Sequence, residues 1–287
     1  MSTCAPSPFD HQKADIILRS SDGVDFRVFK LFLTLASPFF EIMFELPNRR
    51  FCYPSTLAED PSLESLTDIQ AILGAARKYS LDLIERKVCQ ALANPKVLEV
   101  EPLRCFAIAR NARLKHETIT AARYTLQQPL IPAWFAEIEL ITASDLLALL
   151  TYHKKCGIAV EPLLANLDWV MSHYGSSGGC NWLFLPQIPG SKSNCQCGRS
   201  TEAKFKLWAP APVLWWATYM NETFELLRDI PSGDVARSEA EKTIQKVRSA
   251  GCTTCSSQVK ANMEEFSNLL ALNVEKATAS IELEMDF

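Results

Sequence analysis

The stretch ADIILRSSDGVDFRVFKLFLTLASPFFEIMF, Ala14 to Phe44, decides the fold of the N-terminal part of the chain. Its first half holds two short segments rich in β-branched and aromatic residues, 15–19 and 25–29, separated by Ser-Ser-Asp-Gly. An Asp-Gly pair can supply the positive φ angles of a tight turn, so this pattern predicts a β-hairpin. Apolar residues then recur near helical spacing, but Ser37-Pro38 interrupts them. Because proline fits the first turn of a new helix, we expect two abutting helices here.

Beyond an irregular, proline-marked stretch at 51–61, the strand signal nearly vanishes and helical periodicity takes over. Helices are expected at 68–79, 81–93, 100–113, 116–127, 144–155, 213–228, 236–248 and 257–284. Ser144 is the expected N-cap of its helix. Residues 174–211 are rich in glycine, serine, lysine and cysteine, which indicates a loop region. The last helix carries an apolar stripe that we expect to pack on neighbouring helices of the same chain, although a coiled-coil dimer seam is the alternative.

These patterns predict an α+β fold, mainly α, with an N-terminal hairpin and helices, a helical array and a long C-terminal helix. We expect four segments, namely a hairpin-containing domain at 1–93, a helical extension at 94–174, a Cys/Gly/Pro-rich loop region at 175–211, and C-terminal helices at 212–287.

Composition and charge narrow the class of protein. Of 287 residues, 48% are hydrophobic and 22% charged, which is typical of a globular chain. The 29 basic and 33 acidic residues give a net charge of −4, which argues against a nucleic-acid partner. No secretory signal opens the chain, and no apolar run is long enough to span a membrane. We therefore expect a soluble intracellular protein, in the cytoplasm or nucleus, without a membrane partner.

The N-terminal pattern resembles the opening of a BTB/POZ domain of the fungal type. The matching positions are Asp15, Phe26, Val28, Lys30, Leu33, Ser37-Pro38-Phe39-Phe40 and Met43-Phe44. Two later segments, RFCYPSTLAEDPSLESLTDIQAILGAARKYSLDLIERKVCQAL and EPLRCFAIARNARL, look like the remaining helices of that domain and their continuation. The resemblance covers roughly residues 9–155.

The chain departs from the family pattern in two places. Phe29 stands where family members usually carry histidine, which affects packing more than chemistry. Only Asn48 and Arg49 separate Pro47 from Arg50, where BTB domains carry a third strand and most of the next helix. The resemblance therefore implies a truncated BTB/POZ-like domain at 1–93, with apolar surface left for a partner to cover.

The resemblance implies a non-enzymatic protein-interaction scaffold or adaptor that can form a homodimer through its N-terminal elements. Asp15 and Lys30 match family positions near the dimer surface, and a solvated or hairpin-local charge is the competing interpretation of each. Many BTB proteins also dock a cullin-3 scaffold, so a cullin-3 ubiquitin-ligase substrate adaptor is the alternative function.

Cysteine spacing suggests a second kind of site. Cys195 and Cys197 form a CxC pair, and Cys252 and Cys255 form a CxxC pair, so the four thiolates can complete a tetrahedral zinc site. Cys180 and His173 are spare ligands. Scattered reduced thiols are the competing interpretation. A redox pair at 252–255 is a further alternative, although a thioredoxin-like site needs a preceding strand.

No converging set of catalytic residues is found in the sequence. Gly175-Ser176-Ser177-Gly178-Gly179 matches the GxSxG pattern, but the nucleophile elbow needs a strand before the serine, and 164–174 looks helical. No P-loop, GxGxxG or HExxH motif occurs. We therefore expect no catalytic residues and, apart from a structural zinc ion, no cofactor.

Overall fold

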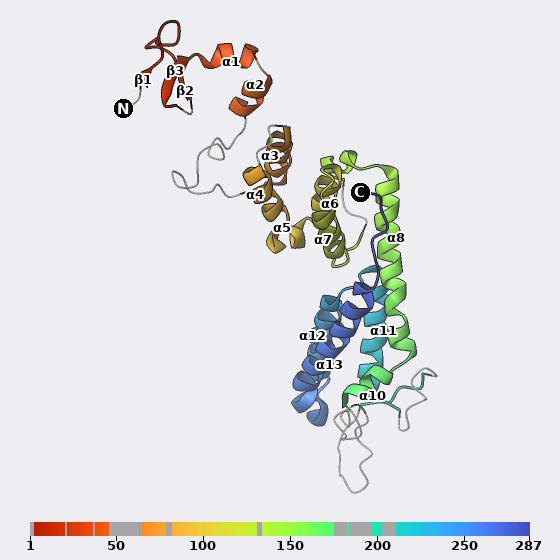
Figure 1. Cartoon of the computed structure of the whole chain (residues 1–287). Helices are drawn as coiled ribbons and strands as arrows, with labels where there is room; N and C mark the ends of the chain where they lie inside the picture. Colours follow the sequence, from red (N-terminus) through yellow and green to blue (C-terminus); the bar gives the residue numbers. More distant parts are fainter. Residues whose placement is uncertain are drawn as a thin grey trace. The chain divides into compact units, whose positions relative to one another are not determined.

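The computed structural model describes residues 3–20, 22–36, 38–45, 63, 65–78, 82–130, 134–174, 183, 197–202 and 211–287. The chain divides into two compact units, Met1–Val97 and Leu98–Phe287. The first unit contains the strands, and the second is built from helices (Figure 1). The fold is therefore α+β and mainly α, as expected. The division lies close to the expected boundary at residue 93, and the expected segments 94–174, apart from its first four residues, and 212–287 belong to one unit.

The predicted hairpin is confirmed. Strands β2 (Ile16–Arg19) and β3 (Val24–Val28) pair antiparallel, with Leu18 opposite Phe26. Gly23 has a φ of 85°, a left-handed conformation that glycine adopts without steric cost. Arg19 and Asp25 form an ion pair of 2.6 Å across the ends of the two strands.

A third strand, β1 (Thr3–Cys4), was not expected from the sequence. It pairs parallel to β3, with Thr3 opposite Val24, so the sheet order is β1-β3-β2. Two residues are too few to show the alternation on which a strand prediction depends.

Within the described residues, four helices of the first unit follow the sheet in the chain. They are α1 (Lys30–Ala36), α2 (Pro38–Glu45), α3 (Leu66–Lys78) and α4 (Asp82–Leu92). The expected break is confirmed, because Pro38 is the first residue of α2. Helix α3 packs against α4 and buries Ile69, Ile72 and Leu73. The junction after Pro47, where the family pattern predicts a missing strand, lies outside the described residues.

Helix α5 (Pro95–Val100) lies at the division, and the second unit follows it. Its elements are α6 (Pro102–Asn111), α7 (Lys115–Thr125), the 3-10 helix η2 (Ala136–Leu140), α8 (Ala143–Val160), α9 (Pro162–Ala165), α10 (Asp168–Tyr174), α11 (Leu214–Asp229), α12 (Gly233–Ser249) and α13 (Thr253–Ala279). Helix α8 packs against both α11 and α13, which come later in the chain, and α12 packs along α13 (Figure 1).

The expected N-cap of α8 is wrong, because the cap is Thr142 and not Ser144. The Thr142 hydroxyl accepts a hydrogen bond from the Asp145 backbone N–H at 3.1 Å, and the Asp145 carboxylate accepts one from the Thr142 N–H at 3.0 Å. This reciprocal capping box satisfies backbone donors that a cap at Ser144 would leave without partners.

The hydrophobic core of the second unit centres on α11, α12 and α13. Trp216 and Phe266 are fully buried, and their rings meet edge to face with centroids 5.5 Å apart. The predicted stripe of the last helix is confirmed as an intrachain core, since Val259, Met263 and Leu270 are at most 1% exposed. A close approach between α8 and α11 occurs at Gly157, where a Cβ atom would clash with the Arg228 carbonyl oxygen.

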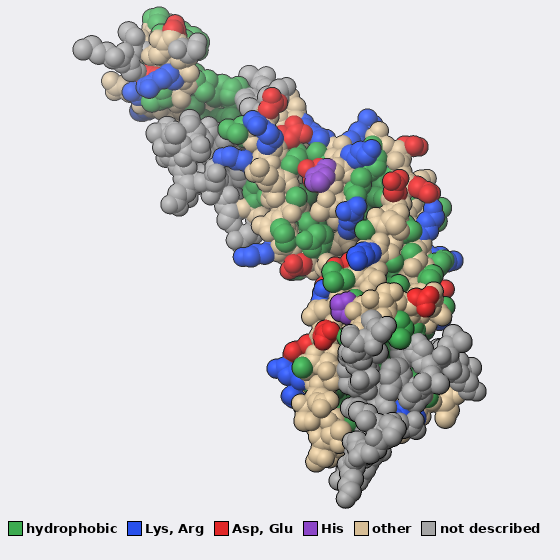
Figure 2. All heavy atoms as spheres, turned by 60° about the horizontal axis from the view of Figure 1, so that its bottom comes forward, with side chains coloured by type: hydrophobic (Ala, Val, Ile, Leu, Met, Phe, Trp, Pro, Cys, Tyr) green, Lys and Arg blue, Asp and Glu red, His purple; other side chains and the backbone are tan. Residues whose placement is uncertain are grey.

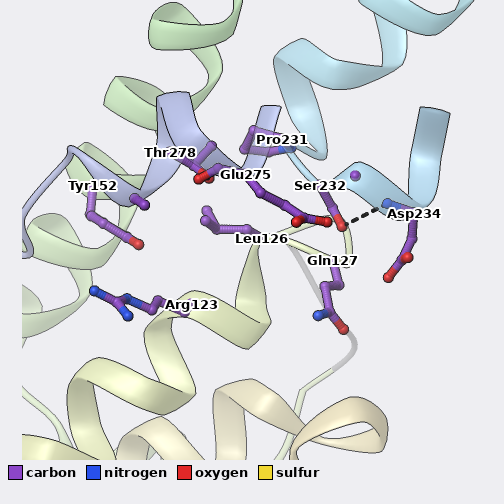
Figure 3. A pocket seen from close by; sticks show the side chains of 11 residues that line it. Arg123, Leu126, Gln127, Tyr152, Pro231, Ser232, Asp234, Glu275 and Thr278 are labelled. Atoms are coloured by element: carbon purple, nitrogen blue, oxygen red, sulfur yellow. Dashed lines mark hydrogen bonds between the residues drawn. The ribbon is translucent and has the colours of Figure 1, made fainter. Parts of the chain in front are cut away.

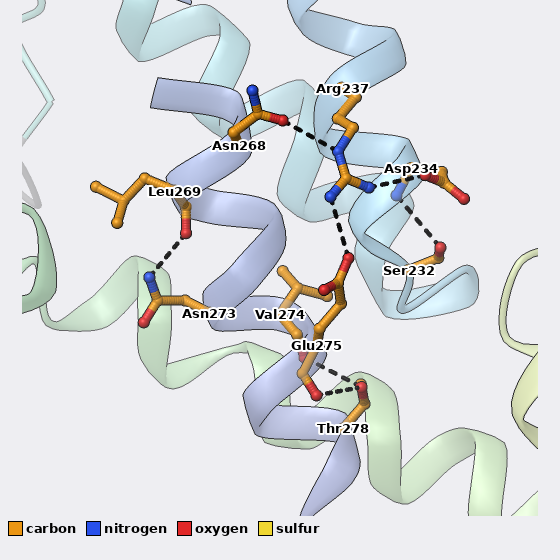
Figure 4. Close-up of polar contacts among 9 residues, drawn as sticks. All are labelled: Ser232, Asp234, Arg237, Asn268, Leu269, Asn273, Val274, Glu275 and Thr278. Atoms are coloured by element: carbon orange, nitrogen blue, oxygen red, sulfur yellow. Dashed lines mark hydrogen bonds and ion pairs between the residues drawn. The ribbon is translucent and has the colours of Figure 1, made fainter. Parts of the chain in front are cut away.

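Polar contacts tie α12 to α13 at the solvent-facing side of this core (Figure 4). The Arg237 guanidinium donates to Asp234 at 2.8 Å on its own helix, and to Glu275 and Asn268 on α13, each at 3.2 Å. Because Arg237 is 40% exposed, these contacts orient the two helices more than they stabilise them.

Among the helices that the structure describes, none combines the length and the apolar character needed to cross a membrane.

Candidate metal centre and interaction surface

Three of the predicted zinc ligands converge in the second unit. The ligand atoms of Cys197, Cys252 and Cys255 all lie within 4.8 Å of one another. The Sγ atoms of Cys197 and Cys255 are 3.6 Å apart although 58 residues separate them in the chain. That distance exceeds the roughly 2.05 Å of a disulfide and is close to the roughly 3.8 Å edge of a tetrahedral zinc–sulfur site. The geometry is therefore that of a thiol cluster suited to metal binding.

The turn between α12 and α13 positions Cys252 and Cys255. Gly251, two residues after the end of α12, has a φ of 75°, and Cys252 follows as the N-cap residue of α13. Cys255 stands three residues later in the first helical turn, and both side chains are buried. Helix α12 precedes this CxxC pair, whereas a thioredoxin-like redox site needs a strand at that place.

Backbone pairing to the start of α11 positions Cys197. The Gly198 carbonyl accepts a hydrogen bond from the Leu214 N–H at 2.8 Å, and the Ser200 N–H donates to the Pro212 carbonyl at 3.0 Å. Arg199 and Val213 form an antiparallel bridge between these two bonds, and the Arg199 side chain donates to the Ala211 carbonyl. This short ladder holds Cys197 beside the core and not in a free loop.

The other predicted ligands do not join the described cluster. Cys195 and Cys180 lie outside the described residues. His173 is on α10 with its Nε2 atom 3.7 Å from the Glu265 carboxylate, which is ten residues along α13 from Cys255. Ten helical residues rise about 15 Å, so His173 is too distant to ligate the same ion. Helix α10 meets the middle of α13 because Trp169 packs against Phe266 there.

Buried cysteines elsewhere in this unit differ in chemistry. Burial raises the pKa of Cys105 to about 12 and that of Cys156 to about 11. Both thiols therefore stay protonated at neutral pH, and neither is a ready nucleophile or metal ligand.

Asp15 and Lys30, the predicted interaction residues, meet each other in the first unit. The Asp15 carboxylate accepts a hydrogen bond from the Lys30 backbone N–H at 2.7 Å, which caps the start of α1. The Lys30 ammonium lies 5.1 Å from the centre of the Phe44 ring on α2. Both side chains thus have local structural roles.

Apolar surface left for a partner was expected in the domain at 1–93, and α1 carries such an exposed surface, which the sequence did not assign to a particular element. Leu31, Phe32 and Leu35 are 63%, 64% and 76% exposed, and Ile17 on β2 is 53% exposed. Figure 2 shows hydrophobic side chains at the surface of the N-terminal part of the chain. The spacing of Leu31, Phe32 and Leu35 in the sequence identifies an apolar face without saying what covers it. We call Leu31, Phe32 and Leu35 the α1 surface.

A cavity of about 240 Å³ lies within the second unit, between the C-terminal end of α7 and helices α8, α12 and α13 (Figure 3). Arg123 lines it together with Asp234 and Glu275, so its wall carries both signs of charge and favours no single ligand charge.

Comparison of the chain with models of protein families, with curated proteins and with solved structures found no match.

Proposed function

We propose that the chain is a non-enzymatic protein-interaction scaffold that self-associates through the α1 surface. The observation that carries the proposal is the exposure of Leu31, Phe32 and Leu35 on one short helix. Removing a cluster of large apolar side chains from water is favourable, so such a cluster indicates a surface that a partner covers. Burying one leucine contributes about 1.5–3 kcal/mol to the free energy of association.

The charge of α1 favours a second copy of the same unit as the partner. Between Leu31 and Ala36 the helix carries no charged residue, so two copies can meet without bringing like charges together. The resemblance to BTB/POZ domains also supports a second copy as the partner, because those domains dimerise through their N-terminal elements. The proposed role requires no catalytic group.

Analytical ultracentrifugation of the full chain over a concentration series tests the proposal. The wild-type chain is expected to form a dimer, and Leu31→Glu is expected to weaken dimerisation at least about tenfold, because a twofold interface loses the leucine twice. Glutamate in the first helical turn suits the helix dipole, so α1 itself is retained.

The matched control is Leu147→Glu, since Leu147 on α8 is 64% exposed and Leu31 63%. This variant is expected to dimerise like the wild type. A wild-type chain that stays monomeric at every concentration contradicts the proposal, and so does a Leu31→Glu chain that dimerises unchanged.

A further inference from the structure

The thiol cluster of the second unit has a chemistry that the proposed scaffold role does not use. Its ligand atoms are three sulfurs from two distant parts of the chain, Cys197 and the pair Cys252 and Cys255. Soft thiolate ligands in a tetrahedral arrangement select zinc over magnesium or calcium, which prefer oxygen.

The start of α13 suits negatively charged ligands. Cys252 is its N-cap residue, and Cys255 lies in its first turn. The helix is 27 residues long, and the N-terminus of such a helix carries a partial positive charge that stabilises thiolates and the negative charge of a zinc–thiolate centre.

The backbone around the cluster is formed by contacts that need no metal. The Leu214 N–H bond to Gly198 holds the segment of Cys197, and the Ser256 N–H bond to the Cys252 carbonyl, at 2.9 Å, holds the first turn of α13. A zinc ion added to these thiols would join two preformed segments and would change the distances between the sulfurs by no more than about 1 Å, because these atoms lie within 4.8 Å of one another and the tetrahedral edge is roughly 3.8 Å.

We propose that Cys197, Cys252 and Cys255 bind one zinc ion as thiolates and that the ion links the segment 197–200 to the start of α13. Each of the three thiols releases its proton on binding. The zinc is structural, and it fixes a part of the unit where the chain is rich in glycine and serine. Cys195, predicted from the sequence as the fourth ligand, lies outside the described residues, and its role remains a prediction.

Metal analysis of the full chain, purified without chelator from zinc-supplemented cells, tests the proposal. One zinc ion per chain is expected for the wild type, with a cobalt-substituted form that shows the charge-transfer and d–d absorption of a tetrahedral thiolate site. The variants Cys197→Ser, Cys252→Ser and Cys255→Ser are expected to lose zinc affinity by more than about tenfold. Cys4→Ser is the control, because Cys4 is exposed on β1 and should leave zinc unchanged.

Thiol alkylation of the wild type keeps the test valid if a variant fails to fold. Zinc should protect these three cysteines from iodoacetamide, and a chelator should expose them, as peptide mapping reads directly. Four outcomes overturn the proposal. They are a chain without stoichiometric zinc after refolding in its presence, iron with acid-labile sulfide in place of zinc, a native Cys197–Cys255 disulfide, and alkylation that chelation leaves unchanged.

Discussion

At the scale of single residues, His153 is a buried base whose protonation opposes the fold. Burial lowers the pKa of His153 from its ordinary value of 6.5, and this outweighs the carbonyls of Thr125 and Gln128 and the charge of Asp229, which raise it. Its Nε2 atom lies 3.3 Å from the Thr125 carbonyl oxygen. The folded protein therefore holds this side chain neutral.

We predict that the free energy of unfolding falls as the pH drops below about 6.5, the ordinary pKa of histidine. The folded pKa of His153 is below the unfolded one, so the unfolded chain binds more protons between the two values. The contribution of neutral His153 to the free energy of unfolding is complete above about pH 6.5. It is lost as the pH falls from there through the pKa of His153 in the folded protein. Hydrogen bonds from Arg104 lower the pKa of Glu137 below its ordinary value of 4.5. Glu137 therefore affects the pH dependence of stability only below about pH 4.5. Chemical denaturation at several pH values measures the slope.

His153→Gln should flatten this slope, because it removes the titrating group. The exposed His116 provides the control, since His116→Gln should leave the pH dependence as it is in the wild type. A His153→Gln chain with the wild-type slope would show that another group is responsible.

The sequence predicted the three converging thiols as ligands of one site, but not the contact that brings Cys197 to the other two. The spacing of Cys252 and Cys255 is local and identifies a ligand pair, because two residues between cysteines place both thiols on one turn. Cys197 joins them through the ladder with residues 212–214, a contact that no local pattern encodes. His173 was predicted as a spare ligand on sequence distance, but the packing of α10 on α13 places it elsewhere.

At the scale of elements, the hairpin and the helices with strong periodicity were predictable, and the helix ends were less so. Gly23 and Pro38 act through their own backbone geometry, so the turn and the break between α1 and α2 follow from the sequence. The exposed side of α1 did not follow, because an apolar face has the same spacing whether covered or open. The cap of α8 depended on a choice between Thr142 and Ser144, two residues of similar propensity.

We predict that Thr142→Ala lowers the free energy of unfolding by about 1 kcal/mol, because it removes the acceptor for the Asp145 N–H. Ser144→Ala should change it by less than about 0.5 kcal/mol, since alanine suits an exposed helical position. Urea denaturation of the two variants compares them directly. Equal destabilisation by both would contradict the capping box described for α8.

At the scale of the whole molecule, the two compact units have separate stabilising contacts. The hydrophobic core of α11, α12 and α13 draws all its members from residues of the second unit. We predict that calorimetry of the full chain shows two unfolding transitions, because two-state behaviour fails when units have independent cores. A fragment of residues 94–287 should retain one of them at the same temperature within a few degrees. A single transition, or an unfolded fragment, would contradict this prediction.

The order of helices in the second unit has a consequence for its synthesis. Helix α8 packs against α11 and α13, and Ala279 at the end of α13 follows Val160 at the end of α8 by 119 residues. At about 5–20 residues per second, a ribosome needs roughly 6–24 s to make them. During that time α8 lacks at least part of its native packing against α11 and α13, although Leu149 and Val160 on its apolar side are buried in the folded unit. The core of the second unit is therefore completed only once the last helix of the unit has been made.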